Sequence, residues 1–175
     1  MSRLSATTLR KELARPWQHG THYAARGAEI AEPVRLDGMT LCGFDLSAAH
    51  FARALSARGA TFRGLSWLHD ARIEGTVDFA GATFRTDLRL DGLRAARLDL
   101  SDTRFEGVLR LDRARVGEVV LDRSCHLANV SMAGVVFERL GLKDCEMLGG
   151  LWLEGARIRR VSSAGLHVEG RRRDG

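Results

Sequence analysis

The feature that most constrains this chain is an apolar residue that recurs every five or six positions from Leu36 to Val168. Of the 26 positions in this series, 23 carry a large apolar residue, and six of the seven phenylalanines lie on it. Chance does not produce such a register over most of a chain. We call these the core positions: Leu36, Leu41, Leu46, Phe51, Ala57, Phe62, Leu68, Ile73, Phe79, Phe84, Leu90, Ala95, Leu100, Phe105, Leu111, Val116, Leu121, Leu127, Met132, Phe137, Leu142, Met147, Leu153, Ile158, Ser163 and Val168.

Neither a helix, with about 3.6 residues per turn, nor a strand, with a repeat of about two, produces a period of five. A large apolar residue that recurs at this spacing is what one side of a square coil needs, because it points to the axis while its neighbours face solvent. A second series, of smaller residues, lies two places before the core positions and fits near the corners. It includes Ala49, Ala60, Ala71, Val77, Ala82, Val119, Cys125, Val130, Val135, Cys145 and Ala156.

The pattern resembles the repeat of the pentapeptide-repeat family, which reads Ala-Asp/Asn-Leu-x-x in outline. Residues 44–48 read Phe-Asp-Leu-Ser-Ala, residues 60–64 read Ala-Thr-Phe-Arg-Gly, and the likeness covers residues 34 to 170. The resemblance implies an all-β fold, a right-handed quadrilateral β-helix with four repeats per coil, and therefore about 6.5 coils here. One column of core side chains would then stack through the rod: Leu41, Phe62, Phe84, Phe105, Leu127, Met147 and Val168.

The two ends of the series differ in character. We expect residues 1–33 to form an N-terminal cap with a short helix, because Leu4, Leu9 and Leu13 share one helical face before Pro16. The β-helix would span residues 34–169, and residues 170–175 would form a basic polar tail without a cap. Since a solenoid end needs cover, Leu166 and Val168 are candidate contacts for an end-to-end homodimer, which light scattering would detect.

Arginine is frequent at the outward position just before each core residue. One side of the coil would carry Arg72, Arg94, Arg115 and Arg157, and the next side would carry Arg89 and Arg110 in line with Trp67 and Trp152. Stacked arginines between aromatic residues are a possible surface for an acidic protein or a nucleic acid. The alternative is that Asp91, Asp112 and Glu154 neutralise these arginines around one corner.

Other reactive residues do not form a recognisable site in the sequence. Cys125 and Cys145 would lie in one column on adjacent coils, which permits a disulfide but also the simple packing of two small residues. His19 and His22 have a ligand-like spacing without further ligands, and the remaining histidines fall on outward positions. We therefore expect no catalytic set, no metal, no cofactor and no enzyme activity.

The formal net charge of +5 suggests a basic protein, but the charge is uneven along the chain. Residues 1–35 contribute +3, residues 36–169 contribute none because 18 basic residues meet 18 acidic ones, and residues 170–175 contribute +2. The predicted rod is thus electroneutral with basic ends. A polyanion would be sought first at the N-terminal segment or at Arg171, Arg172 and Arg173.

Three cysteines without an apolar leader favour free thiols in a reducing compartment, and we expect a cytoplasmic protein. No apolar run approaches the length that crosses a membrane, so no membrane partner is expected.

The sequence favours a rigid interaction scaffold that binds a protein partner whose identity it does not reveal. The family resemblance suggests a second role, protection of DNA gyrase by a DNA-mimicking rod, but that role needs a strongly negative surface and the repeat region is neutral. A third role is polyanion binding through the arginine-rich sides. We expect a protein partner in preference to nucleic acid.

Overall fold

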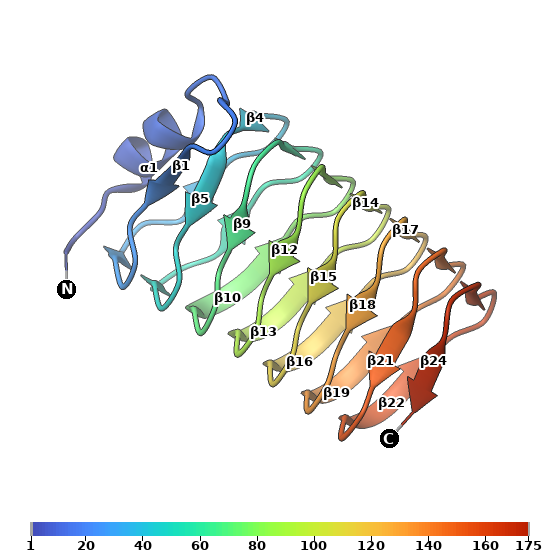
Figure 1. Ribbon diagram of the computed structural model, residues 1–175. Coiled ribbons are helices and arrows are strands. Elements are labelled where there is room, and N and C mark those ends of the chain that lie inside the picture. Colours follow the sequence, from blue (N-terminus) through green and yellow to red (C-terminus); the bar gives the residue numbers. More distant parts are fainter. Residues whose placement is uncertain (1, 175) are drawn as a thin grey trace.

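The computed structural model describes residues 2–174 as a parallel β-solenoid of about seven turns with one short helix at its N-terminal end (Figure 1). Consecutive coils stack with all strands in parallel register, so that Phe62 pairs with Phe84 and Phe84 with Phe105. The predicted all-β repeat fold and its helical cap are therefore confirmed. The turn count slightly exceeds the 6.5 coils predicted, because both ends of the chain add strands.

Three sheets make the sides of the rod. Sheet B comprises β1 (His22–Ala24), β5 (Gly43–Asp45), β9 (Ser66–Trp67), β12 (Leu88–Arg89), β15 (Leu109–Arg110), β18 (Val130–Ser131), β21 (Leu151–Leu153) and β24 (Arg172–Asp174). Sheet C comprises β4 (Thr40–Leu41), β8 (Thr61–Phe62), β11 (Thr83–Phe84), β14 (Arg104–Phe105), β17 (Cys125–His126), β20 (Glu146–Met147) and β23 (His167–Val168).

Sheet A is larger because its strands bend around a corner and cover two sides of the coil. It comprises β2 (Glu29–Ile30), β3 (Val34–Arg35), β6 (His50–Phe51), β7 (Leu55–Ser56), β10 (Arg72–Asp78), β13 (Arg94–Asp99), β16 (Arg115–Val120), β19 (Val136–Gly141) and β22 (Arg157–Ser162). From β10 onward a single strand spans both sides, whereas β6 and β7 divide them in the earlier coil.

Two other corners of each coil are tight turns. Gly81 and Gly92 have φ of +69° and +68°, and each is followed by a backbone hydrogen bond that closes the turn. Ala82 N–H donates to the carbonyl of Phe79 at 3.0 Å, and Leu93 N–H donates to that of Leu90 at 3.0 Å. A positive φ at the third of four bonded residues defines a type II turn, which glycine favours. The residue that follows each turn, Ala82 or Leu93, is buried in the coil.

Apart from Leu127 and the exposed Ser163 in the last coil, the core positions are buried or partly buried, as predicted. The predicted column contained Leu127, but the structure pairs Phe105 with His126 and His126 with Met147. His126 is 1% exposed and Leu127 is 38% exposed. The corner between sheets C and B takes six residues in each coil from Phe62 onward, and this coil keeps that length. The backbone register therefore places His126 inside the coil and Leu127 outside, although leucine is the more hydrophobic of the two.

The central column is a stack of aromatic rings. Phe62 and Phe84 have ring centroids 4.3 Å apart, and Phe84 and Phe105 lie 5.3 Å apart with their planes 5° from parallel. His126 continues the stack at 4.5 Å from Phe105. Burial of these rings contributes to the hydrophobic stabilisation of the rod.

The N-terminal helix α1 (Ala6–Leu13) covers the first coil with fully buried Leu9 and Leu13. The Ser5 hydroxyl accepts a hydrogen bond from Thr8 N–H at 3.0 Å, which caps the first turn. At the helix end, Leu13 carbonyl accepts from Cys42 N–H at 2.9 Å. This attachment places the helix over an end of the solenoid that would otherwise expose its core.

The predicted boundaries of the β-helix are too narrow at both ends. β1 pairs with β5 and β2 with β6, so the first coil includes residues that we assigned to the cap. At the other end β24 pairs with β21, so Arg172 and Arg173 form part of the last coil rather than a free tail. The N-terminal addition buries side chains as well, since Ile30 pairs with Phe51 and is 1% exposed, whereas β24 is exposed and is recruited by backbone pairing alone.

The three cysteines are free thiols, and the column that we assigned to Cys125 is wrong. The change in register at His126 moves Cys125 to the outward position between Arg104 and Glu146. Its place beside Cys145 inside the coil is taken by Ser124, whose hydroxyl lies 3.5 Å from the Cys145 sulfur. The possible Cys125–Cys145 disulfide is therefore absent.

We expect native thiol labelling to distinguish these cysteines. Cys125 is partly exposed, whereas Cys42 and Cys145 are buried and burial raises the pKa of both thiols. Because the thiolate is the reactive form, a maleimide should modify one thiol per chain quickly and the other two only after denaturation. Mass spectrometry of the wild type and of Cys125→Ser checks this, and fast modification of Cys145 would contradict the burial described.

Candidate interaction surface

The arginines predicted on one side of the coil form one continuous row on sheet A. The parallel register joins Arg72 to Arg94, Arg94 to Arg115, Arg115 to Val136 and Val136 to Arg157. We call these five residues the arginine row. All five are exposed, and Val136, at 41% exposure, is a large apolar residue in the middle of a charged row.

The predicted neutralisation of this row is wrong. Arg72 pairs with Glu74 at 2.8 Å, but within residues 2–174 no carboxylate oxygen lies within 4.0 Å of the guanidinium nitrogens of Arg94, Arg115 or Arg157. The acidic residues expected there pair instead across sheet B. Their contacts are Asp91 with Arg110 at 3.3 Å, Asp112 with Arg110 at 2.7 Å, and Glu154 with Arg173 at 3.3 Å.

The second predicted row lies on sheet B and is balanced in charge. Register places Trp67, Arg89, Arg110, Ser131 and Trp152 in one line, which we call the tryptophan row. The Arg89 guanidinium lies over the Trp67 ring at 5.8 Å. This row therefore has the expected aromatic residues at both ends, but its arginines are engaged by neighbouring carboxylates.

Two carboxylates, those of Asp91 and Asp112, neutralise the arginines of the tryptophan row. Asp91 is 5% exposed and lies near Arg110 as well as His69, whose Nδ1 is 3.4 Å away. Burial of Asp112 opposes ionisation, but hydrogen bonds from the Ser131 hydroxyl, the Arg110 guanidinium and a backbone amide hold its pKa below the usual range. Arg89 therefore lies near the carboxylate of Asp91, and Arg110 lies near those of Asp91 and Asp112.

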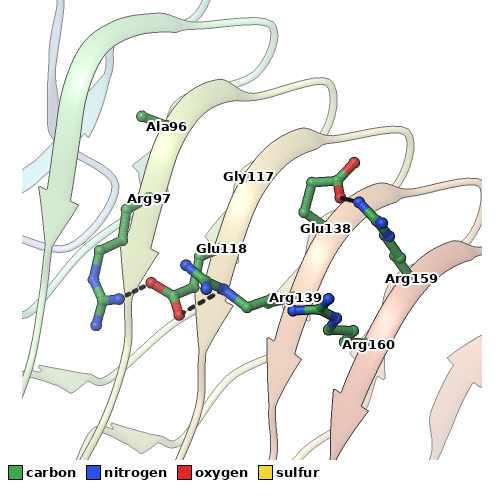
Figure 2. A pocket seen from close by; sticks show the side chains of 8 residues that line it. All are labelled: Ala96, Arg97, Gly117, Glu118, Glu138, Arg139, Arg159 and Arg160. Atoms are coloured by element: carbon green, nitrogen blue, oxygen red, sulfur yellow. Dashed lines mark hydrogen bonds and ion pairs between the residues drawn. The ribbon is translucent and has the colours of Figure 1, made fainter.

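A further charged row lies at the bend of sheet A and was not predicted. It consists of Arg97, Glu118, Arg139 and Arg160, which we call the corner row (Figure 2). Glu118 forms ion pairs with both Arg97 and Arg139, the second at 3.2 Å. Among the described residues no carboxylate lies within 4.0 Å of the Arg160 guanidinium. A spacing of 21 residues, one coil, relates all four positions and was the available signal.

Small residues separate the corner row from the arginine row. Ala96 and Gly117 lie side by side between the two rows, and we call this low strip the furrow (Figure 2). A Cβ atom on Gly117 would lie 2.6 Å from the Ala96 carbonyl oxygen, so the close approach of these strands requires glycine. Two open hollows of about 490 and 420 Å³ meet at Ala96, one toward the corner row and one toward Arg94 and Arg115.

The rod is electroneutral in sum but its charge is unevenly distributed around it. Strands β13, β16, β19 and β22 carry seven arginines and three acidic residues. By contrast, Arg172 and Arg173, which we predicted as the first place to seek polyanion binding, pair with Asp174 and Glu154 at 2.8 and 3.3 Å. Arg172 and Arg173 are therefore neutralised at the end of the chain, whereas Arg94, Arg115 and Arg157 on sheet A have no carboxylate partner among the described residues.

Histidine, serine and cysteine come together at one place, but inside the coil. The Ser124 hydroxyl lies 2.8 Å from His126 Nε2, and Cys145 donates to the Leu121 carbonyl at 2.7 Å. Ser124, His126 and Cys145 are each 1% exposed, so a substrate has no access to them. The predicted outward position of His126 is wrong, and its contacts are those of a buried structural group.

The remaining predicted sites are simple to place. His19 packs edge-on against Trp17, and within residues 2–174 no group of three or more potential ligands is arranged to hold a metal. None of the described helices has the length and apolar character needed to cross a membrane. Leu166 and Val168 lie partly buried in the last coil, and the end-to-end homodimer stays a prediction.

Comparison with known protein families agrees with this geometry. The family model described as pentapeptide repeats (9 copies) matches residues 36–83 and 57–103. The repeats of residues 36–103 are those of the pentapeptide-repeat family. The coils of this chain continue in the same register beyond the matched residues as far as β23. Searches of the curated proteins and of the solved structures found no match. Proteins of this family are generally non-catalytic, and the fold is that of a repeat scaffold.

Proposed function

We propose that this protein is a non-catalytic scaffold that docks a protein partner on sheet A. The observation that carries the proposal is the arginine row, in which Arg94, Arg115 and Arg157 have no carboxylate partner among the described residues. Charged residues that only solubilise a surface are usually interspersed with the opposite sign, as in the tryptophan row. A row of unpaired arginines on rigid strands suits recognition of acidic groups, because a guanidinium binds a carboxylate in bidentate fashion.

A DNA-mimicking protector of gyrase is supported less well. That role requires a strongly negative surface, whereas strands β13 to β22 carry an excess of arginine. The three free thiols support a reducing compartment, and we place the protein in the cytoplasm on that ground.

The scaffold proposal predicts that a captured partner depends on the arginine row. We expect the tagged wild type to retain a specific protein from host lysate and the Arg94→Glu/Arg115→Glu/Arg157→Glu variant to lose it, because charge reversal turns attraction into repulsion. Quantitative mass spectrometry of the two eluates measures this effect.

A charge-matched variant controls for the change in net charge. Arg63, Arg85 and Arg104 lie on or beside strands of sheet C and are exposed, so their triple substitution by Glu alters net charge equally but leaves sheet A intact. This control should keep the partner, and circular dichroism should show the same β-sheet content in all three proteins. Equal capture by both triple variants would refute the proposed surface.

A further inference from the structure

The geometry points to one kind of partner for sheet A: we propose that an acidic amphipathic α-helix of another protein lies along the rod over the arginine row and the furrow. This inference rests on the proposed scaffold function and specifies what the scaffold recognises. It follows from the spacing of the rows, their residue types and the relief between them.

The spacing of the arginine row matches a helix better than a strand. Neighbouring coils are about 4.8 Å apart, since they are hydrogen-bonded strands. A helix presents one side chain per turn to a given face at intervals of about 5.4 Å. Over the three steps from β13 to β22 the mismatch reaches about 2 Å, which arginine side chains can absorb. An extended peptide repeats on one face at about 6.7 Å, and over the same steps it drifts by about 6 Å, more than a full coil.

The residue types of the row define the helix face that fits it. From β13 to β22 the row reads Arg94, Arg115, Val136 and Arg157. The complementary helix carries acidic, acidic, apolar and acidic residues at successive turns, that is at positions i, i+4, i+7 and i+11. Val136, at 41% exposure, gives the apolar residue a partner and fixes the register of the helix along the row.

The furrow explains how a helix approaches so flat a surface. Ala96 and Gly117 leave a low strip beside the arginine row, bordered on its other side by Arg97 and Glu118 (Figure 2). A ridge of small or apolar side chains on the helix packs into this strip, while the acidic face turns toward Arg94 and Arg115. Beyond Gly117 the same hollow is lined by Glu138 and Arg159, which pair with each other at 3.3 Å.

Nucleic acid and a second copy of the chain fit this surface less well. Both tryptophans of the solenoid, Trp67 and Trp152, belong to sheet B and lie away from this surface. Base stacking therefore has no aromatic platform at the furrow. A second copy docked face to face through the same row would set arginine against arginine.

A synthetic peptide tests the proposal directly. The probe is an 18-residue, fluorescein-labelled helix with Glu at i, i+4 and i+11 and Leu at i+7, prepared also with the sequence order reversed because the helix direction is open. We expect at least one of the two to bind the wild-type protein in a fluorescence anisotropy titration, with an affinity that falls as salt rises. A peptide of identical composition, with these four residues distributed around the helix, should bind about tenfold more weakly.

Variants of the protein separate recognition from general charge attraction. The Arg94→Glu/Arg115→Glu/Arg157→Glu protein should lose binding of the acidic peptide and gain binding of a peptide with Lys at the same three positions. The sheet C triple variant should bind the acidic peptide as the wild type does. Val136→Asp, which leaves all the arginines in place, should weaken binding of the acidic peptide.

The peptide titration and the host capture together distinguish the helix proposal from the scaffold proposal. Equal binding of the patterned and scrambled peptides, no binding of either patterned peptide, or displacement of the peptide by a duplex DNA that binds more tightly would each overturn the helix proposal. If host capture still depends on the arginine row in that case, the scaffold function stands and only the nature of its ligand is wrong. If host capture does not depend on the arginine row while the peptide binds as expected, the captured protein is not a partner of sheet A. The scaffold proposal is then wrong, but the helix-binding site remains.

Discussion

Replacing Phe84 by alanine should lower the free energy of unfolding by about 3–5 kcal/mol, the largest loss that we expect from any single substitution in the rod. Phe84 is 0% exposed and lies in the middle of the aromatic column. Its ring stacks on Phe62 at 4.3 Å and on Phe105 at 5.3 Å, and it meets Phe79 edge-on at 5.7 Å. The substitution therefore removes three aromatic contacts and leaves a cavity.

The shape of the solenoid makes this cavity difficult to close. Each coil is held at a fixed height by hydrogen bonds to the coils on both sides, so Phe62 and Phe105 cannot move together without breaking them. Partial collapse is what reduces the cost of large-to-small substitutions elsewhere. We therefore expect a loss toward the upper part of the range, with unfolding that begins at the affected coil.

Thr83→Ala is the matched control, because Thr83 is on the same strand and points outward. It should change stability by less than about 0.5 kcal/mol. Urea unfolding followed by both circular dichroism and tryptophan fluorescence measures the two effects and tests whether the transition is two-state. A loss below about 1 kcal/mol for Phe84→Ala would show that the column is not the main source of stability.

The sequence predicted the fold well because one physical demand is repeated in each coil. A side chain at the axis must be apolar and large, and a side chain at the corner must be small, so the positions of Phe62, Phe84 and Phe105 appear directly as a period. The error at His126 and Leu127 has the same origin. Hydrophobicity favours Leu127 inside, but the six-residue corner and the backbone register of the adjacent coils decide the matter.

The candidate surface was predicted only in part, because ion pairs depend on distances that a linear pattern does not contain. The alignment of Arg94 with Arg115 follows from the repeat. Asp91, however, pairs with Arg110 and not with Arg94, because Asp91 lies on the sheet B side of the corner. The corner row was missed because positions at a bend carry no hydrophobic constraint. Arg172 was assigned to a free tail because a strand that adds to an edge needs no core residue.

His126 should make the folded state lose stability as pH falls below 6.5. Burial lowers the pKa of His126 from its ordinary value of 6.5 to about 3. The unfolded chain therefore takes up a proton near pH 6.5 that the folded chain refuses, so stability is fully present above that pH and is lost as pH falls toward 3. At about 1.4 kcal/mol per pH unit, the loss between pH 6.5 and pH 4.5 should be on the order of 2–3 kcal/mol.

The acidic groups do not obscure this window. Hydrogen bonds from Ser47 and Arg26 outweigh the burial of Asp45, and those from Ser101 and Arg97 outweigh the burial of Asp99, so both pKa values lie below 3.8. These carboxylates contribute stability above pH 3.8 and lose it only at lower pH, as their folded forms are protonated. His50 and Arg72 likewise hold the pKa of Glu74 below 4.5, so its contribution is lost only from the acid end of the range downward, and the slope between pH 6.5 and pH 4.5 reports chiefly on His126.

His126→Phe should remove this slope without a loss of stability at pH 7. Phenylalanine already occupies the equivalent place at Phe62, Phe84 and Phe105, and the substitution eliminates the buried His126 Nδ1, which has no hydrogen-bond partner among the described residues. It also removes the contact of His126 Nε2 with the Ser124 hydroxyl, but that hydroxyl keeps its hydrogen bond to the Leu121 carbonyl at 2.6 Å. The exposed His167, two coils along on the same sheet, provides the control: His167→Gln should leave the slope intact. Urea unfolding of the three proteins at pH 7, 6, 5 and 4.5 measures the effect. A slope that persists in His126→Phe would mean that another group takes up the proton and that the imidazole is not held neutral within the aromatic column.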